Sequence, residues 1–344
     1  MAKAGRPVQG ATVIDVAARA GVSAMTVSRV INGRSGVSPA TREAVERAIA
    51  ELSYVPNVAA RSLVTSAELR IGVVYSNPSA AFMSELLTGV FEEASTRGAR
   101  LVLLKGEGGR APSADALARF AASGLSGVLL APPLGEAPAV LQALRGLNVP
   151  IAAIAAHHVP GATCVRIDDR RAAYEMTRHL LDQGHRRLGF VLGNPNQAAS
   201  LERRAGLEDA LRETRDATVQ IAQGDFSYVS GLAAGEQLLD GPTPPTAIFA
   251  SNDDMAAAIV SVAHRRQLDV PRQLTVVGFD DTTAAVTLWP PLTTIHQPVR
   301  RLAAEALALV ADEARAVSGR IPAPRDRVLD YALVARSSTA APPA

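Results

Sequence analysis

The sequence contains little cysteine and few aromatic residues. Of its 344 residues, one is a cysteine, Cys164, and 4% are aromatic. A single cysteine excludes an internal disulfide and a cysteine-rich zinc or iron–sulfur site, and it fits a reducing compartment. No apolar run approaches the ~20 residues that a membrane helix needs, and the first 20 residues contain neither an apolar core nor a secretory cleavage site. We therefore expect a cytoplasmic protein that makes no contact with a membrane.

Motifs for catalysis and for metal binding are also missing from the sequence. The glycine-rich stretch at residues 105–110 lacks the G-K-[ST] of a phosphate-binding loop, and there is neither a G-x-S-x-G elbow nor an H-E-x-x-H pair. The six histidines show no metal-ligand spacing beyond the adjacent His157 and His158. We expect neither an enzyme nor a bound metal or cofactor.

What the sequence does contain is a globular composition with an uneven distribution of charge. The chain is 48% hydrophobic and 20% charged, and at ~150 residues per domain its length predicts about two domains. Residues 1–66 contain eight basic and four acidic side chains, whereas the rest contains 27 basic and 29 acidic ones. A basic head on a slightly acidic body favours a polyanionic partner for the head, although an ordinary solvated surface can carry the same excess.

Residues 12–32, TVIDVAARAGVSAMTVSRVIN, predict two short helices joined by a tight turn. Apolar residues recur at helical spacing, Gly21 ends the first helix, and Ser23 is placed to cap the second. A third helix is expected to begin at Ser38. Two helices across a three-residue turn are typical of a helix-turn-helix, although a three-helix bundle without a ligand has the same pattern.

The second of these helices exposes short hydroxyl side chains, two apolar side chains and an arginine. Hydroxyls of this size suit phosphate contacts, an apolar side chain can touch a thymine methyl, and an arginine can donate to guanine O6 and N7. We expect phosphate contacts from Ser23, Thr26 and Ser28, and base-edge contacts from Ala24, Met25 and Arg29.

From residue 69 onward, short apolar runs alternate with amphipathic helical stretches. This alternation is typical of parallel sheets covered on both faces, which bind small ligands at the carboxyl ends of their strands. The expected strands lie at residues 70–75, 99–104, 127–131, 151–155, 187–192, 219–223, 246–250 and 275–279, and expected helices lie at 82–96, 170–183, 201–213, 229–239 and 255–266.

Together, these motifs resemble the lactose-repressor/purine-repressor (LacI/GalR) family over residues 12–338. In the head the resemblance rests on V-S-R-V-I-N, S-P-A-T-R-E and L-S-Y-V-P-N-V-A-A-R-S-L. In the body it rests on R-R-A-G, G-D-F-S, N-D-D-M-A, V-G-F-D-D and P-P-L-T-T-I, which begin at Arg203, Gly224, Asn252, Val277 and Pro290.

The resemblance implies a small all-α helix-turn-helix DNA-binding head and an α/β bilobed body like that of periplasmic binding proteins, with two parallel-sheet subdomains. The implied boundaries are 1–56 for the head, 57–68 for a hinge helix and linker, and 69–338 for the ligand-binding and dimerisation body. Within the body, the N-subdomain is expected at 69–167 and 298–325 and the C-subdomain at 168–297 and 326–338, with crossovers near 166–169, 296–298 and 324–328.

The resemblance also assigns the DNA contacts. It places Ala24, Met25 and Arg29 at base-reading positions, and Ser23, Thr26, Ser28, Asn32, Ser38 and Thr41 at phosphate-contacting positions. Residues 57–64 resemble the hinge helix, with Asn57, Ala60 and the wedge residue Leu63 facing the minor groove. Eight residues are too few for a stable isolated helix, so this hinge is expected to fold only against DNA and the dimer partner.

The resemblance likewise assigns the ligand site, and the residue types suit a polyol. The expected ligand-binding residues are Arg203, Asn252, Asp280, Phe226 and Gln297, with Phe82 and Ser76 as weaker candidates. Asn252 and Asp280 can instead cap the segments that follow them. The family often has an Asp where this chain has Ala155, so that either His157 or His158 replaces this acceptor or the ligand lacks the matching hydroxyl.

From the residues and the resemblance we expect a homodimeric regulator, bound to double-stranded nucleoid DNA at a palindromic operator and released from it by a sugar effector. The alternative within this class is a corepressor-type regulator whose DNA binding a purine-like or phosphorylated ligand tightens. A solute-binding or transport protein is disfavoured by the attached head and the missing signal peptide. A tetramer is not expected, because the sequence ends without leucine heptads.

Overall fold

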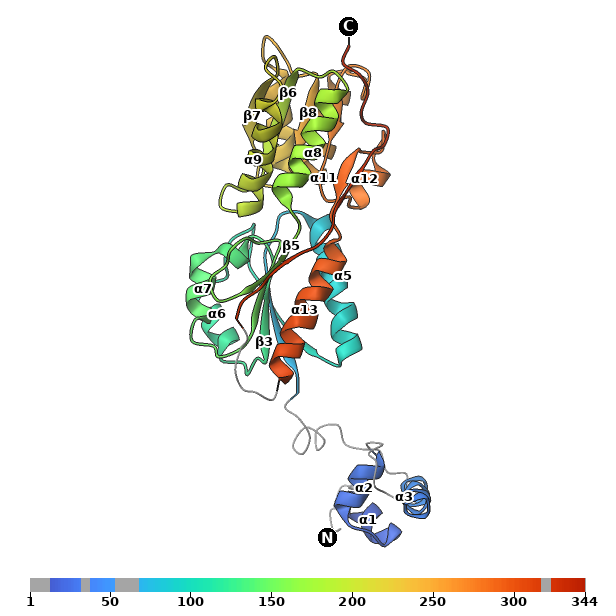
Figure 1. Cartoon of the computed structure of the whole chain (residues 1–344). Coiled ribbons are helices and arrows are strands. Elements are labelled where there is room, and N and C mark those ends of the chain that lie inside the picture. Colours follow the sequence, from blue (N-terminus) through green and yellow to red (C-terminus); the bar gives the residue numbers. More distant parts are fainter. Residues whose placement is uncertain (1–12, 32–37, 53–67, 317–322, 344) are drawn as a thin grey trace, which may run out of the picture. The chain divides into compact units, whose positions relative to one another are not determined.

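The computed structural model describes residues 13–31, 38–52, 68–316 and 323–343. Contacts between residues of the chain divide the structure into two compact units, Met1–Glu68 and Leu69–Ala344 (Figure 1). Four predicted DNA-contacting residues lie outside the described parts: Asn32, Asn57, Ala60 and Leu63. The expected hinge at residues 57–64 therefore stays a prediction.

The first unit contains three short helices, α1 (Val13–Ala20), α2 (Ala24–Ile31) and α3 (Pro39–Glu51). Gly21 has the left-handed conformation, with φ 65°, that ends α1. The apolar side of each helix contributes to one small core, which contains Val16, Val27 and Val45. The predicted helix-turn-helix and third helix are thus present.

In the second unit, one lobe is built on a six-stranded parallel sheet in the order β11-β5-β4-β3-β1-β2. Its strands are β1 (Arg70–Tyr75), β2 (Arg100–Lys105), β3 (Gly127–Leu130), β4 (Ile151–Ile154), β5 (Thr163–Arg166) and β11 (Asp326–Val328). Helices α5 (Ala80–Arg97) and α13 (Val299–Arg315) cover one face, and α6 (Ala114–Ala121) and α7 (Pro138–Leu144) cover the other (Figure 1). We call this the first lobe; it also contains the 3-10 turn η1 (Leu134–Glu136).

The second lobe is built on a four-stranded parallel sheet in the order β7-β6-β8-β9. Its strands are β6 (Arg187–Leu192), β7 (Thr218–Gln223), β8 (Ala247–Ala250) and β9 (Thr275–Val277). Its helices are α8 (Asp169–Asp182) and α9 (Ala198–Arg212) on one face, α10 (Tyr228–Leu239) and α11 (Asp253–Arg265) on the other, and the short α12 (Thr283–Thr287). Because both faces are covered, strands such as β8 are apolar and buried along their whole length. This architecture confirms the predicted fold class.

The third crossover between the lobes differs from our expectation. We predicted that residues 326–338 belong to the C-subdomain, but β11 pairs in parallel with β5 of the first lobe, from Asp326 beside Cys164 to Val328 beside Arg166. The Arg166 guanidinium also donates two hydrogen bonds to the Asp326 carboxylate. The chain therefore crosses after Val328, since β11 first pairs with the edge of β5 that faces away from β4. After the crossing, β12 (Ala332–Val334) pairs antiparallel with β10 (Thr294–His296).

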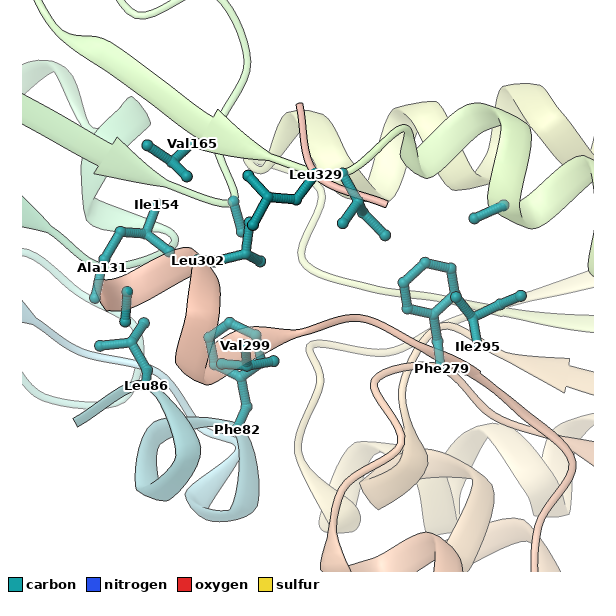
Figure 2. Packing of buried hydrophobic residues seen from close by; sticks show 14 of the residues in the cluster. Phe82, Leu86, Ala131, Ile154, Val165, Phe279, Ile295, Val299, Leu302 and Leu329 are labelled. Atoms are coloured by element: carbon teal, nitrogen blue, oxygen red, sulfur yellow. The ribbon is translucent and has the colours of Figure 1, made fainter. Parts of the chain in front are cut away.

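One cluster of buried hydrophobic residues extends through both lobes. Figure 2 shows Phe82 beside Val299 at the start of α13, and Phe279 beside Ile295 at the other end of the connecting segment. The crossovers thus lie against apolar side chains of both lobes. In the parts of the chain that the structure describes, no helix is both long and apolar enough to cross a membrane.

Candidate functional site

A pocket lined by residues of both lobes lies between them. Most lining residues come one to four residues after the end of a strand, near the edge where parallel sheets bind ligands. The first lobe contributes Asn77, Ser79, Phe82, Pro132 and Ala155, and the second contributes Gln197, Arg203, Phe226, Asn252, Asp280 and, at a crossover, Gln297.

Six of the seven predicted ligand-binding residues line this pocket: Phe82, Arg203, Phe226, Asn252, Asp280 and Gln297. Ser76 is buried but is not among the lining residues, and its hydroxyl oxygen instead accepts the Gly109 N–H at 2.9 Å. The structure therefore brings most of the set together, while their role in binding stays a prediction.

Arg203 is held rigidly in the pocket wall. Its Nε donates a hydrogen bond to Asp169 Oδ1 at 2.9 Å, and its Nη1 donates to the Ser251 carbonyl at 2.5 Å. Nη2 also lies 2.9 Å from Asp169 Oδ1, within ion-pair distance. The guanidinium carbon lies 3.6 Å from the centre of the Phe279 ring. Burial acts to raise the pKa of Asp169, but the charge of Arg203 and the hydrogen bond from His157 hold it below its ordinary value. The arginine charge is thus already neutralised within the protein.

Asp280 and Asn252 are held by different partners. Asp280 accepts a hydrogen bond from Gln297 Nε2 at 2.5 Å, and its Oδ1 lies 4.0 Å from Arg203 Nη1. Burial raises the pKa of Asp280 well above its ordinary value, although Arg203 acts in the opposite direction. Asn252 caps α11, because its Oδ1 accepts the Met255 N–H at 3.0 Å, while its Nδ2 donates to the Phe226 carbonyl. The capping role that we weighed for Asn252 is therefore present beside its place in the pocket.

Asp253 is a buried acid whose role sequence reasoning missed. Its carboxylate accepts the hydroxyl of Thr294 at 2.7 Å, and both the N–H and the hydroxyl of Thr282, at 2.7 Å and 3.1 Å. Burial raises the pKa of Asp253 to about 7. These bonds fix the loop that carries Asp280 into the pocket.

Neither His157 nor His158 lines the pocket. His157 Nε2 instead lies 3.2 Å from Asp169 Oδ2, and its backbone N–H donates to Glu136 Oε1 at 2.9 Å. His158 is exposed. The structure therefore does not support the idea that a histidine side chain replaces an acceptor at Ala155.

Ala155, which the resemblance placed at a position where the family often has an Asp, also lines the pocket. Four lining residues were missed, namely Asn77, Ser79, Pro132 and Gln197. The first three come two to four residues after the end of β1 or β3, so the rule of strand ends could have found them. Gln197 stands out in the structure, because its side-chain oxygen is buried without a hydrogen-bond partner among the described residues.

In the helical head, the predicted base-reading residues Ala24, Met25 and Arg29 are exposed, and Met25 is 68% exposed. Two hydroxyl pairs cap helices there: the Ser23 oxygen accepts the Thr26 N–H at 3.2 Å, and the Ser38 oxygen accepts the Thr41 N–H at 3.2 Å. The Ser28 backbone lies within α2, but its side chain is outside the described part. A capped helix start with exposed hydroxyls is suited to a phosphate.

Comparisons with known proteins match both units. The model of bacterial regulatory proteins of the lacI family matches residues 12–57, and a periplasmic binding protein-like domain matches residues 177–339. The HTH-type transcriptional regulator CelR of Thermobifida fusca is 37% identical over 342 residues, covering 94% of this chain and 96% of CelR. The HTH-type transcriptional repressor CytR of Escherichia coli is 32% identical, covering 99% of this chain and 100% of CytR.

Solved structures give the same result. A CelR–cellobiose complex is 34% identical, with a TM-score of 0.70, and 97% of this chain and 100% of that chain are covered. A lac repressor dimer bound to operator and to the anti-inducer ONPF is 30% identical, with a TM-score of 0.78 and the same coverage. These relatives are transcriptional regulators and not enzymes.

Proposed function

Because this chain belongs to the lacI family of bacterial regulatory proteins, we propose that it is a repressor that a sugar or sugar derivative releases from a palindromic operator. Two copies bind as a dimer, with one head on each half-site. CytR is named as a repressor, the lac repressor structure is an operator-bound dimer, and the CelR structure holds cellobiose. The observation that carries the proposal is the combination in one chain of this head with a polar pocket between two lobes.

For the DNA side, the proposal assigns base contacts to the exposed Ala24, Met25 and Arg29, and phosphate contacts to the hydroxyl side chains that begin α2 and α3. The N-terminus of a helix attracts phosphate through its free N–H groups and its dipole. The assignment also includes Leu63 as the wedge in the minor groove.

For the ligand side, charge favours an uncharged sugar over a phosphorylated ligand. Among the residues lining the pocket, Arg203 is the one cation, and its charge is paired with Asp169. A phosphate placed there would lose its hydration without gaining an unpaired positive charge, which is costly in a buried site. A polyol needs donors and acceptors but no net charge, and this wall supplies both.

Contacts from both lobes provide a route from the pocket to the head. A sugar that touches Phe82 of the first lobe and Arg203 and Asn252 of the second stabilises one relative position of the lobes over others. In a dimer, that shift changes the separation of the two hinge segments, which are too short to stay helical alone. Couplings of ~1–3 kcal/mol between two such sites are typical.

The DNA part of the proposal is tested by fluorescence anisotropy on the DNA upstream of the protein's own gene, over a range of salt concentrations. We expect the logarithm of the affinity to fall linearly with the logarithm of the salt concentration, because phosphate contacts release counterions. An affinity that is independent of salt, or equal for unrelated DNA, would contradict it.

A further inference from the structure

Glu136 forms hydrogen bonds with both lobes through its two carboxylate oxygens. It ends η1 in the first lobe, where its Oε1 accepts the His157 N–H at 2.9 Å. Its Oε2 accepts the Ala198 N–H at 2.8 Å, and Ala198 is the first residue of α9 in the second lobe. Hydrogen bonds with a charged partner are stronger than those between neutral groups. We call Glu136 and these two N–H groups the interlobe clasp.

The clasp supplies a cap that α9 does not obtain from its own lobe. The residue directly before a helix usually binds the first N–H groups with its side chain, but Gln197 makes no such bond. The N–H groups and the dipole of a helix start favour a carboxylate at this place. Because the carboxylate comes from the first lobe, separation of the lobes would leave the start of α9 without this partner.

The clasp is also connected to the arginine in the pocket wall. His157, whose N–H binds Glu136, lies with its Nε2 3.2 Å from Asp169 Oδ2. Asp169 begins α8 in the second lobe, and it accepts a hydrogen bond from Arg203 of α9 at 2.9 Å. Glu136 therefore holds α9 directly at its first residue, and indirectly through His157 and Asp169. A shift of α9 relative to the first lobe would break both connections.

A second contact between the lobes lies at the start of another helix. Ser79, which precedes α5 in the first lobe, accepts the Phe82 N–H at 3.2 Å. Burial raises the pKa of Asp254, near the start of α11 in the second lobe, while a hydrogen bond from Ser79 acts to lower it. Each lobe thus contributes one carboxylate to a helix start of the other lobe, and the contact of Asp254 reports on the lobes independently of the clasp.

We propose that Glu136 is a positioning residue that holds the two lobes together in the absence of a ligand. Its two bonds lie on opposite sides of the boundary between the lobes, which a cap serving one lobe alone would not require. Glu136 does not line the pocket, so an effector there leaves its carboxylate in place. The clasp sets the resting balance between joined and separated lobes, on which an effector then acts. Its consequence for DNA binding rests on the proposed function.

The test is hydrogen–deuterium exchange with mass spectrometry on the full-length protein without a ligand. Glu136→Ala removes the clasp from the side of the first lobe. Ala198→Pro removes the bond to α9 from the other side, because proline has no N–H and is well tolerated at the first position of a helix. Gln197 has φ −121° and ψ 124°, which suits the residue before a proline.

We expect both variants to accelerate exchange at the second contact, in peptides from the first turns of α5 and α11, by about tenfold or more. The double variant should exchange no faster than Glu136→Ala, because both substitutions remove the same bond. Glu136→Gln keeps one acceptor oxygen and should lie between the wild type and Glu136→Ala. If Glu136→Ala does not fold in a thermal melt, Glu136→Gln and Ala198→Pro take its place.

Two substitutions in the first lobe provide matched controls. Ala114→Pro places a proline at the first position of α6, after Ser113 with φ −61° and ψ 154°. Glu107→Ala removes the carboxylate of an exposed residue. Both should leave exchange in α5 and α11 unchanged. Faster exchange that is confined to His157 and the start of α9 would reduce Glu136 to a local cap and overturn the inference, as would wild-type exchange in the clasp variants.

DNA binding separates this inference from the proposed function. In fluorescence anisotropy without a ligand, Glu136→Ala and Ala198→Pro should change the affinity for the DNA upstream of the protein's own gene in the same direction, by about fivefold or more. If exchange accelerates but this affinity stays that of the wild type, the clasp is established and the proposed route from the pocket to the head fails. If exchange is unchanged while a sugar still releases the DNA, the proposed function stands and Glu136 does not hold the lobes.

Discussion

The buried pair of Arg203 and Asp169 makes a quantitative prediction. The two residues are 3% and 1% exposed, and their side chains share a hydrogen bond and a second ion-pair contact, both at 2.9 Å. Arg203→Leu removes the cation and leaves a buried carboxylate with His157 as its other side-chain partner. Breaking a buried ion pair from one side costs ~3–5 kcal/mol. For a unit of this size we expect the melting temperature to fall by on the order of 10 °C.

Three further variants test whether the unpaired charge causes this fall in melting temperature. Asp169→Asn should also destabilise the protein, but the double variant should lose much less than the sum of the two single losses. Arg204→Leu is the matched control, because Arg204 pairs with Glu208 on the exposed side of the same helix and should contribute no more than ~1 kcal/mol. Thermal melts of all four variants provide the measurement. Additive losses, or an Arg203→Leu effect no larger than that of Arg204→Leu, would refute the reasoning.

The remaining predictions concern other parts of the chain. Burial raises the pKa of Asp253 to about 7, so stability measured by urea unfolding should fall as the pH rises from about 4 through 7, and Asp253→Asn should flatten this dependence. Gly206→Ala should destabilise the protein by ~1–3 kcal/mol in the same assay, because its Cβ would lie 2.0 Å from a backbone oxygen of α8. In binding assays, Ala24→Arg should change the preferred operator sequence, whereas Thr26→Ala should weaken all operators alike; the reverse pattern would contradict the assignment. Leu63→Ala should weaken specific DNA binding with little change in the stability of the ligand-binding body, and an unchanged operator affinity would exclude Leu63 as the wedge residue.

Local patterns in the sequence predicted most of the fold. The sequence marks both ends of strand β8, whose four apolar residues are buried. Asn252 could therefore be placed at a strand end from the sequence alone. The helix-turn-helix was predictable because Gly21 and Ser23 end and begin helices through local backbone chemistry.

Other features depend on contacts between distant residues and leave little trace in the local sequence. All three residues of β11 are exposed, and its place beside β5 depends on pairing across about 160 residues. The start of α9 depends on Glu136 of the other lobe, whose Oε2 accepts the Ala198 N–H. In the same way, whether His157 faces the pocket or Asp169 is decided by the packing of the lobes.

The central claim is that the pocket controls DNA binding, and fluorescence anisotropy with added ligand tests it most directly. The full-length protein is bound to the DNA upstream of its own gene, and cellobiose, D-glucose, D-ribose and a purine such as hypoxanthine are then titrated in turn. The account predicts that one of the sugars lowers the DNA affinity by about 5- to 150-fold, as a coupling of ~1–3 kcal/mol requires. DNA binding that appears only after the purine is added would contradict it and establish a corepressor instead.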